Sequence, residues 1–164
     1  SYIFNGYWRD VGTISYLYES NMDLLGESPK FDISDEAWRI RSRNPIAPPQ
    51  FIGEHGRTVN SLIASGCEID GTVENCILSN NVTVKTGAVV KNSIVFSGTV
   101  IGEDSVIENS IVDENVSVGK ACRIGECKDK TKKIAVLGRD ISVSDHSVIP
   151  DGAMVDCDVK GGEQ

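Results

Sequence analysis

A repeat with a fixed period of seventeen constrains the fold of this chain more than any other feature of its sequence. Three short segments align at this period without gaps, and a fourth segment of the same form precedes them. The three are 73–78, 90–95 and 107–112, and the fourth is 58–63. A fixed period of this length is typical of solenoids, in which a repeat buries its apolar face only by stacking on its neighbours.

Within each interval, aliphatic residues recur at steps of six, five and six. The series holds only Val, Ile and Leu: Val73, Leu78, Val84, Val90, Val95, Ile101, Ile107, Val112, Val118 and Ile124. Several aliphatic positions are followed four positions later by a small residue, as at Ala88, Ser105, Cys122, Ser147 and Ala153. This hexapeptide-repeat pattern predicts a mainly β fold, a triangular coil of parallel strands with one inward aliphatic residue on each face.

Asparagine recurs at one place in the repeat. Asn75, Asn92 and Asn109 follow one another at the period of the repeat. Asn tolerates left-handed backbone angles, and its side chains can form ladders. We therefore expect these three residues to stand one above another at a turn, in a structural role.

The repeat is interrupted once. It loses phase after Ile124, so 126–133 is predicted to loop out of the coil. The register returns with Val143, Ile149 and Val155. Pro150 indicates a terminal, lightly paired coil, because proline cannot donate a ladder hydrogen bond.

The residues before the repeat divide into two pieces. Over 1–26, an apolar stretch and the segment 6–13 lead into a helical stripe, which Thr13 can cap and Gly26 can end. Over 27–50, three prolines interrupt any helix or ladder. The chain is thus predicted to hold a strand–helix unit over 1–26, a Pro-rich linker over 27–50 and a β-helix over 51–164.

Composition narrows the classes of partner. The net charge of −8 and the mixed placement of acidic and basic residues leave no basic stripe for a nucleic acid or an anionic membrane. No apolar run approaches the roughly 20 residues that span a bilayer, and the N-terminus lacks a signal pattern. An odd number of scattered cysteines, five in all, suits a reducing compartment. We expect a cytoplasmic protein without nucleic acid or membrane as partner.

Two histidines are the candidates for acid–base chemistry. Hexapeptide-repeat acyltransferases use a histidine as general base. His55 precedes the regular repeat, and His146 lies in a late coil at a position that points outward at a turn. Two histidines are also too few for a three-imidazole zinc site. An acyltransferase therefore stays an alternative function, which the histidine positions argue against.

The segment Gly6-Tyr7-Trp8-Arg9-Asp10-Val11-Gly12-Thr13 resembles a block of the sugar-phosphate nucleotidyltransferases. Asn21-Met22-Asp23-Leu24-Leu25 resembles its continuation in bacterial ADP-glucose pyrophosphorylases (glucose-1-phosphate adenylyltransferases). The resemblance continues through 42–45, 48–53, 60–63 and 71–75, and so covers nearly the whole chain. It implies that the coil is the left-handed β-helix that forms the C-terminal portion of this family.

The resemblance also implies the site. Asp10 would be the catalytic and metal-binding residue, one of two aspartates that hold Mg²⁺, while Gly6, Trp8 and Gly12 would shape the sugar-phosphate side of the pocket. The implied reaction converts ATP and glucose 1-phosphate to ADP-glucose and pyrophosphate in glycogen synthesis. Plain core packing is an equal interpretation for Trp8.

Further partners follow from the same resemblance. The family's Gly-rich nucleotide-binding segment, second aspartate and sugar-phosphate lysine would belong to a catalytic domain of the same polypeptide, which this sequence does not contain. We therefore expect a fragment without turnover of its own, whose parent forms a homotetramer.

Regulation and alternatives complete the expectations. Arg43 and Arg123 are the residues that would contribute to an effector site for anions, although the acidic coil 101–108 would repel an anion. Two further alternatives are a non-catalytic partner subunit of the same complex, which the intact motif around Asp10 argues against, and a transferase of different base choice.

Overall fold

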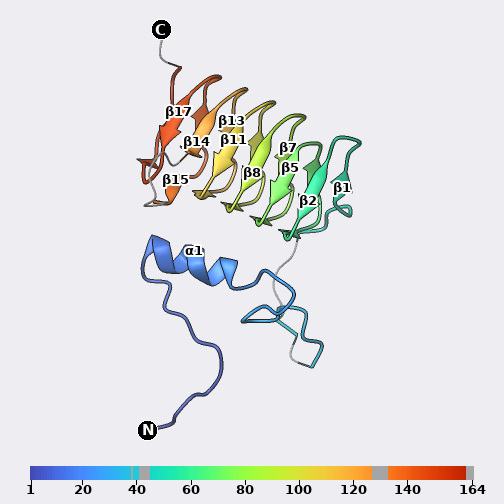
Figure 1. Ribbon diagram of the computed structural model, residues 1–164, viewed down its shortest axis with the longest axis vertical. Coiled ribbons are helices and arrows are strands. Elements are labelled where there is room, and N and C mark those ends of the chain that lie inside the picture. The colour runs from blue at the N-terminus through green and yellow to red at the C-terminus, as the bar shows by residue number, and fades with distance from the viewer. Residues whose placement is uncertain (38, 41–44, 127–132, 162–164) are drawn as a thin grey trace.

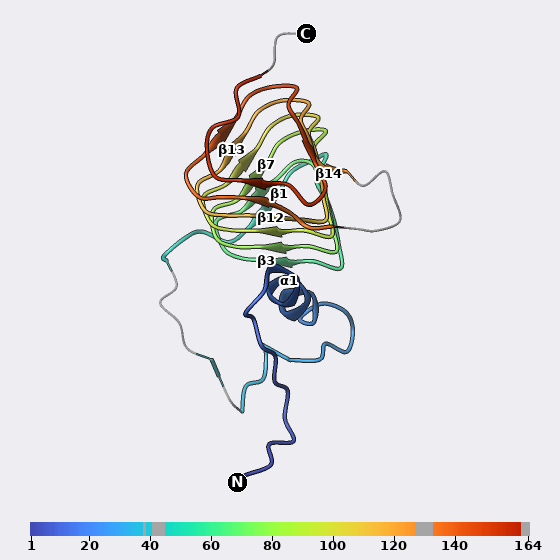
Figure 2. The ribbon, with the colours of Figure 1, turned by 90° about the vertical axis from the view of Figure 1, so that its left-hand side faces the viewer.

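Three parallel sheets of six strands each form most of the molecule (Figure 1). The computed structural model describes residues 1–37, 39–40, 45–126 and 133–161. Viewed along the coil in Figure 2, the sheets make the three sides of a triangle. Successive strands along the chain belong to different sheets, so that each coil contributes one strand to each sheet. This is the mainly β, left-handed parallel β-helix that the repeat and the resemblance predict.

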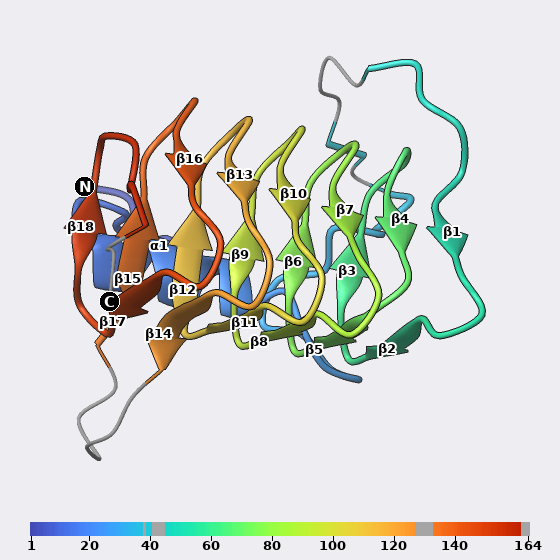
Figure 3. The ribbon, with the colours of Figure 1, turned by 90° about the horizontal axis from the view of Figure 1, so that it is seen from above.

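The strands are short, and every pairing is parallel (Figure 3). Sheet A contains, in spatial order, β1 (Phe51–Ile52), β4 (Glu68–Ile69), β7 (Thr83–Val84), β10 (Val100–Ile101), β13 (Ser117–Val118) and β16 (Ser142–Val143). Sheet B contains β17 (Val148–Pro150), β14 (Arg123–Glu126), β11 (Val106–Glu108), β8 (Val89–Lys91), β5 (Thr72–Glu74) and β2 (Arg57–Val59). Sheet C contains β18 (Met154–Val155), β15 (Ala135–Leu137), β12 (Ser110–Val112), β9 (Ile94–Val95), β6 (Ile77–Leu78) and β3 (Leu62–Ile63).

The predicted aliphatic series forms the core. All ten of its residues are buried, with at most 2% of the surface exposed. The predicted corner residues Ala88, Ser105 and Cys122 are completely buried. Because each inward side chain lies between those of the coils above and below, the coils bury together what one coil would leave in water. The core prediction is confirmed.

The asparagine turn is confirmed as well. Asn75 and Asn92 have φ angles of 56° and 45°, in the left-handed region. The Asn75 amide donates to Asn92 Oδ1 at 2.8 Å, and the Asn60 amide donates to Asn75 Oδ1 at 2.7 Å. Asn109 has a φ of 45° at the equivalent place in the next coil. The side chains thus form a ladder along one corner of the triangle.

The interruption is visible in the strand register. Val90 pairs with Ile107, at the period of the repeat, whereas Val112 pairs with Leu137 across a longer interval. The extra residues lie between β14 and β15, where the coil resumes. The predicted loop over 126–133 falls largely outside the described residues. Pro150 lies in β17, which is an edge strand of sheet B, as expected for a lightly paired coil.

One helix, α1 (Ile14–Met22), lies along the outside of sheet C (Figure 2). The outward positions of sheet C are almost all aliphatic, and two of them, Ile94 and Ile111, are only 1% and 4% exposed. Sheets A and B carry polar residues such as Thr83 and Arg123 at many of their outward positions. Covering the apolar face of sheet C with α1 removes that face from water. Among the described residues, no helix has the length and apolar content needed to cross a membrane.

The segment before the helix differs from its prediction. Residues 1–13 contain no strand, although the sequence predicts one ahead of the helix. Figure 1 shows this segment running away from the β-helix. A strand requires a neighbouring strand to satisfy its backbone N–H and C=O groups, and none of the described strands lies beside this segment. Most of its apolar side chains, among them Tyr2 and Ile3, are consequently exposed.

The described cysteines differ in burial. Cys67, Cys76 and Cys122 are free and buried, as small core side chains should be. Cys157 is free and exposed. Cys127 lies outside the described residues.

Candidate functional site

Local hydrogen bonds shape the segment that carries Asp10. The Gly12 N–H donates to Asp10 Oδ1 at 3.0 Å, which makes a tight turn of the kind that aspartate favours. A Cβ at position 12 would lie 3.2 Å from the same oxygen, so glycine allows the close approach. The Tyr16 N–H donates to Thr13 Oγ1 at 3.2 Å, which confirms Thr13 as the N-cap of α1. The turn therefore leads the chain directly from Asp10 into the helix.

Side chains alternate in burial along residues 7–10. Tyr7 and Arg9 are partly buried, whereas Trp8 and Asp10 are exposed, Trp8 by 74%. This period of two is typical of extended chain, in which neighbouring side chains point to opposite sides. Trp8, Arg9 and Asp10 line a pocket of about 390 Å³ together with Tyr16 of α1. The two predicted site residues with side chains, Trp8 and Asp10, thus face the same open side.

Asp23 binds the two partly buried side chains of this segment, Tyr7 and Arg9. Its Oδ2 accepts from Arg9 Nε at 2.9 Å and from the Tyr7 hydroxyl at 3.1 Å, and its Oδ1 accepts from Lys30 Nζ at 2.7 Å. The Asp23 side chain is only 8% exposed. The hydrogen bonds from Lys30, then Arg9 and Tyr7, lower the pKa of Asp23 against the opposing effect of burial. The carboxylate is therefore charged at neutral pH.

Two further contacts complete the anchoring. The Tyr7 ring stacks on Phe31 with ring centroids 5.4 Å apart. Where α1 faces the β-helix, the Tyr18 hydroxyl donates to the backbone oxygen of Asn92 at 2.6 Å. Burial raises the pKa of Tyr18 to about 12, so this donor keeps its proton. A continuous series of contacts thus joins the asparagine corner of the β-helix to the segment that carries Asp10.

Two further predicted residues, Gly6 and Arg123, make none of the contacts that anchor this cluster. Gly6 precedes the anchored segment, and a Cβ there would clash with the Phe4 ring. Arg123 is exposed at an outward position of β14, in sheet B, whereas α1 covers sheet C. Arg43 lies outside the described residues. Arg123 is therefore not brought together with Asp10 in the structure described.

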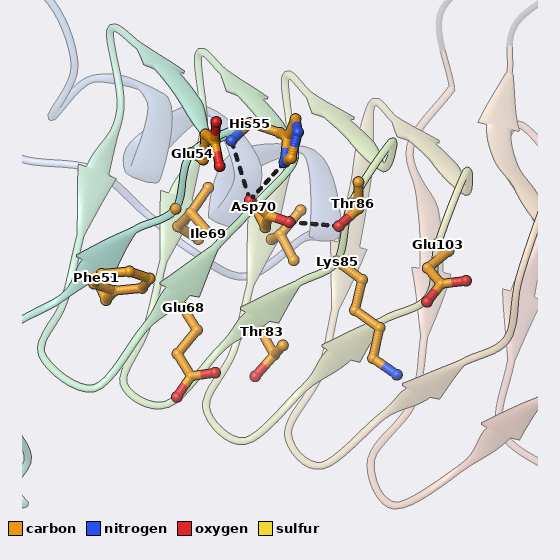
Figure 4. A pocket seen from close by; sticks show the side chains of 12 residues that line it. Phe51, Glu54, His55, Glu68, Ile69, Asp70, Thr83, Lys85, Thr86 and Glu103 are labelled. Carbon is orange, nitrogen blue, oxygen red and sulfur yellow. Dashed lines mark hydrogen bonds and ion pairs between the residues drawn. The ribbon is translucent and has the colours of Figure 1, made fainter.

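A separate pocket of about 560 Å³ lies on sheet A and its corner with sheet B (Figure 4). Only Asp70 and Gly71 connect β4 to β5, whereas four residues connect β7 to β8. The Asp70 carboxylate fills the place of the missing turn residues: it accepts from the His55 N–H at 3.2 Å and from the Thr86 hydroxyl. The hydrogen bond from Thr86 is the largest cause of the lowered pKa of Asp70.

The two histidines occupy exposed turns. His55 Nδ1 lies 3.5 Å from Asp70 Oδ1, and the His55 side chain is 65% exposed. His146 is exposed in a turn with a φ of 61°, as predicted from its place in the repeat. Each histidine therefore lies in a turn of its own, and the two are not gathered at one site.

Sequence reasoning missed Asp23, Tyr7 and Arg9 as parts of the site. The alternation of Tyr7 and Arg9 with Trp8 and Asp10 is readable in the sequence once an extended chain is assumed. Asp23 carries a weaker signal, a lone carboxylate near the end of the predicted helix. Its partners become visible only when the chain turns back to bring residues 7–9 and 30 beside it.

The arrangement suits a metal ligand that works with groups from elsewhere. Among the residues that the structure describes, no three His, Cys, Asp or Glu side chains gather closely enough to hold a metal ion. Asp10 offers one exposed carboxylate whose Oδ1 is already oriented by the Gly12 N–H. Mg²⁺ takes few protein ligands and keeps waters or phosphate oxygens for its other positions. A single, oriented carboxylate fits that requirement.

Comparison with known proteins gives both a family and relatives. The family described as GlmU-like, C-terminal hexapeptide, matches residues 47–140. A glucose-1-phosphate adenylyltransferase of Acetivibrio thermocellus is 43% identical over 158 residues, which is 94% of this chain and 37% of that protein. The enzyme of the same name from Clostridium perfringens (strain 13 / Type A) is 43% identical over 155 residues, 94% of this chain and 39% of that protein. The Geobacillus stearothermophilus one is 48% identical over 90 residues, 55% of this chain and 23% of that protein.

These relatives are similar to the chain along most of its length, but the chain is much shorter than they are. It spans 37% to 39% of the two relatives that match 94% of it. The matched family covers the β-helix from residue 47 to residue 140, which is more than half of the chain. The chain belongs to the family of GlmU-like C-terminal hexapeptide domains.

Proposed function

We propose that this chain is the C-terminal assembly and regulatory portion of a glucose-1-phosphate adenylyltransferase. The complete protein would convert ATP and glucose 1-phosphate to ADP-glucose and pyrophosphate. The proposal rests on the 43% identity to two enzymes of that name along 94% of the chain, a share larger than the β-helix alone. A hexapeptide β-helix alone would not distinguish this activity from that of other transferases.

Asp10 is the proposed catalytic and metal-binding residue. It would hold Mg²⁺ through its exposed carboxylate, while the Gly12 N–H fixes the direction of Oδ1. When bound, Mg²⁺ would neutralise phosphate charge and align the reacting oxygens for in-line displacement. The role of the chain's own residues is to present that carboxylate on the open side of the segment 7–10.

Gly6, Trp8 and Gly12 are proposed to shape the sugar-phosphate side of the same pocket. The exposed Trp8 ring beside Asp10 offers a flat apolar surface of the kind that can lie against a sugar ring. Gly12 keeps the turn tight enough to leave room beside the carboxylate.

The other partners belong to the complete protein. The nucleotide-binding segment, a second carboxylate and a lysine for the sugar phosphate would come from a catalytic domain of the same polypeptide, and the complete protein would be a cytoplasmic homotetramer. The exposed apolar side chains of residues 1–13 support a covering domain, because a covering domain would remove them from water. Arg43 and Arg123 are the proposed contributors to an effector site, and the chain by itself would have no turnover.

The test is Asp10→Asn in the complete protein. Loss of the charged ligand is expected to lower kcat by about two orders of magnitude or more without changing the circular dichroism spectrum. The matched control is Asp35→Asn, since Asp35 Oδ1 accepts the Ala37 N–H at 2.8 Å in a similar turn away from the site. An unchanged kcat in Asp10→Asn would remove this residue from the metal site.

A further inference from the structure

Asp23 is the most heavily engaged carboxylate in the described part of the chain. Three side chains, Tyr7, Arg9 and Lys30, donate to it, and Arg9 approaches with both Nε and Nη2 at 2.9 Å. Its backbone oxygen also accepts the Lys30 N–H at 3.0 Å. One residue therefore ties together the segment before α1, the end of α1 and the chain that follows.

The position of Asp23 is unfavourable for a carboxylate on its own. Asp23 is the C-cap of α1, where unpaired backbone oxygens give the helix end a partial negative charge. A cation is the stabilising choice there, yet the chain places an anion at the cap and brings two cations to it. A helix C-terminus does not by itself require a carboxylate paired with two cations. The side chains that Asp23 binds therefore explain why the carboxylate is there.

Asp23 binds the partly buried side chains of residues 7–10, which alternate with exposed ones. Its donors Tyr7 and Arg9 are separated by a single residue, which places them on the same side of extended chain. Trp8 and Asp10, which alternate with them, are exposed, as expected for side chains on the opposite side. Fixing Tyr7 and Arg9 therefore fixes the side of the chain on which the Asp10 carboxylate lies, while the Gly12 N–H orients its Oδ1. Asp23 makes no direct contact with Asp10 among the hydrogen bonds of the described residues.

We propose that Asp23 is a positioning residue, which orients Asp10 and Trp8 toward the Mg²⁺ and sugar-phosphate side by clamping Tyr7 and Arg9 from behind. This inference rests on the proposed function, since it concerns the same site. It goes beyond that function by assigning a role to a residue that contacts none of the reacting groups. Because precise placement of a catalytic group matters more than its presence nearby, loosening the clamp is expected to weaken the site without removing any ligand.

The test compares Asp23→Asn with Asp32→Asn in the complete protein. Asp32 is the matched control: hydrogen bonds from Ser34 lower its pKa too, but its carboxylate accepts only from that residue among the described contacts. For Asp23→Asn we expect kcat to fall about tenfold or more, and the Mg²⁺ concentration for half-maximal rate to rise about fivefold. Asp32→Asn is expected to change neither quantity by more than about twofold.

A second readout does not depend on turnover. Mn²⁺ is titrated into each variant with ATP present, and the free ion is followed by electron paramagnetic resonance. Asp23→Asn should weaken Mn²⁺ binding about fivefold relative to Asp32→Asn, because the Asp10 carboxylate is no longer held in one direction. A merely structural role would lower thermal stability in Asp23→Asn and leave both the Mg²⁺ dependence and Mn²⁺ binding unchanged, which would overturn the inference.

Tyr7→Phe keeps the test decisive if Asp23→Asn does not fold. It removes one hydroxyl donor to Asp23 and leaves every charge in place. A rise in the Mg²⁺ concentration for half-maximal rate that exceeds the change in Asp32→Asn would support the clamp, and a change no larger than in Asp32→Asn would overturn it. If the unaltered complete protein transfers no nucleotide, the proposed function fails and the inference fails with it. Activity of the unaltered protein with unchanged variants overturns the inference alone.

Discussion

Replacing Asn92 by alanine and by glycine separates the two reasons for asparagine at the corner of the β-helix. Asn92 has a φ of 45°, and its Oδ1 accepts the Asn75 amide at 2.8 Å. Alanine would lose that hydrogen bond, worth about 1 kcal/mol, and would also lose about 1 kcal/mol or more to a left-handed backbone. Glycine would lose only the hydrogen bond. We therefore expect Asn92→Ala to lower the free energy of unfolding by about 2 kcal/mol and Asn92→Gly by about 1 kcal/mol.

The measurement is urea unfolding followed by far-ultraviolet circular dichroism. Asn80 is the matched control, because it lies on the same coil but is absent from the residues with positive φ. There the order should reverse, since glycine is more costly than alanine where the backbone is right-handed or extended. If Asn92→Gly were as destabilised as Asn92→Ala, or more so, the corner would not be a left-handed turn that selects asparagine.

Three other variants or treatments probe the rest of the structure. Tyr18→Phe should lower the free energy of unfolding by about 1 kcal/mol in urea titrations, because it removes the donor that ties α1 to the asparagine corner, whereas Tyr16→Phe should have less effect. Maleimide applied to the native protein should modify the exposed Cys157 and spare Cys76, as detected by peptide mass spectrometry. Burial raises the pKa of Cys76 to about 12, which keeps its thiol protonated. Equal labelling of the two cysteines would contradict the burial of Cys76. Because folding lowers the pKa of Asp23 from its ordinary value of 3.8, its carboxylate stabilises the fold above that pH, and this effect is lost as the pH falls further. The difference in the free energy of unfolding between the unaltered protein and Asp23→Asn should therefore shrink from pH 6 to pH 3. A difference that grew in acid would show that folding raises the pKa of Asp23.

The sequence predicts the β-helix so well because every coil meets the same physical requirement. Val73, Val90, Ile107 and Ile124 are the same inward position in four coils, and their strands pair at those residues. The asparagine corner is predictable for the same reason, since few residues accept a left-handed backbone. The pattern can be recognised in the sequence because every coil must place similar inward and corner residues against its neighbours.

What could not be predicted depends on contacts that occur once. The outward residues Ile94 and Ile111 are buried because α1 covers them, and the helix is far away from both in the sequence. The Asp23 clamp needs the chain to fold back on itself between residues 7 and 30. The strand expected before α1 does not form among the described residues, because an isolated segment offers no partner to pair with.

Nucleotidyl transfer by the complete protein decides whether this chain is part of an adenylyltransferase. The protein is given glucose 1-phosphate and Mg²⁺ with ATP, GTP, UTP, CTP and dTTP in separate reactions, and pyrophosphate release is measured. We predict activity with ATP alone, which would make this chain the C-terminal portion of a glucose-1-phosphate adenylyltransferase. Activity with another nucleotide in place of ATP would contradict the base assignment, and no activity with any nucleotide would instead favour a non-catalytic partner subunit.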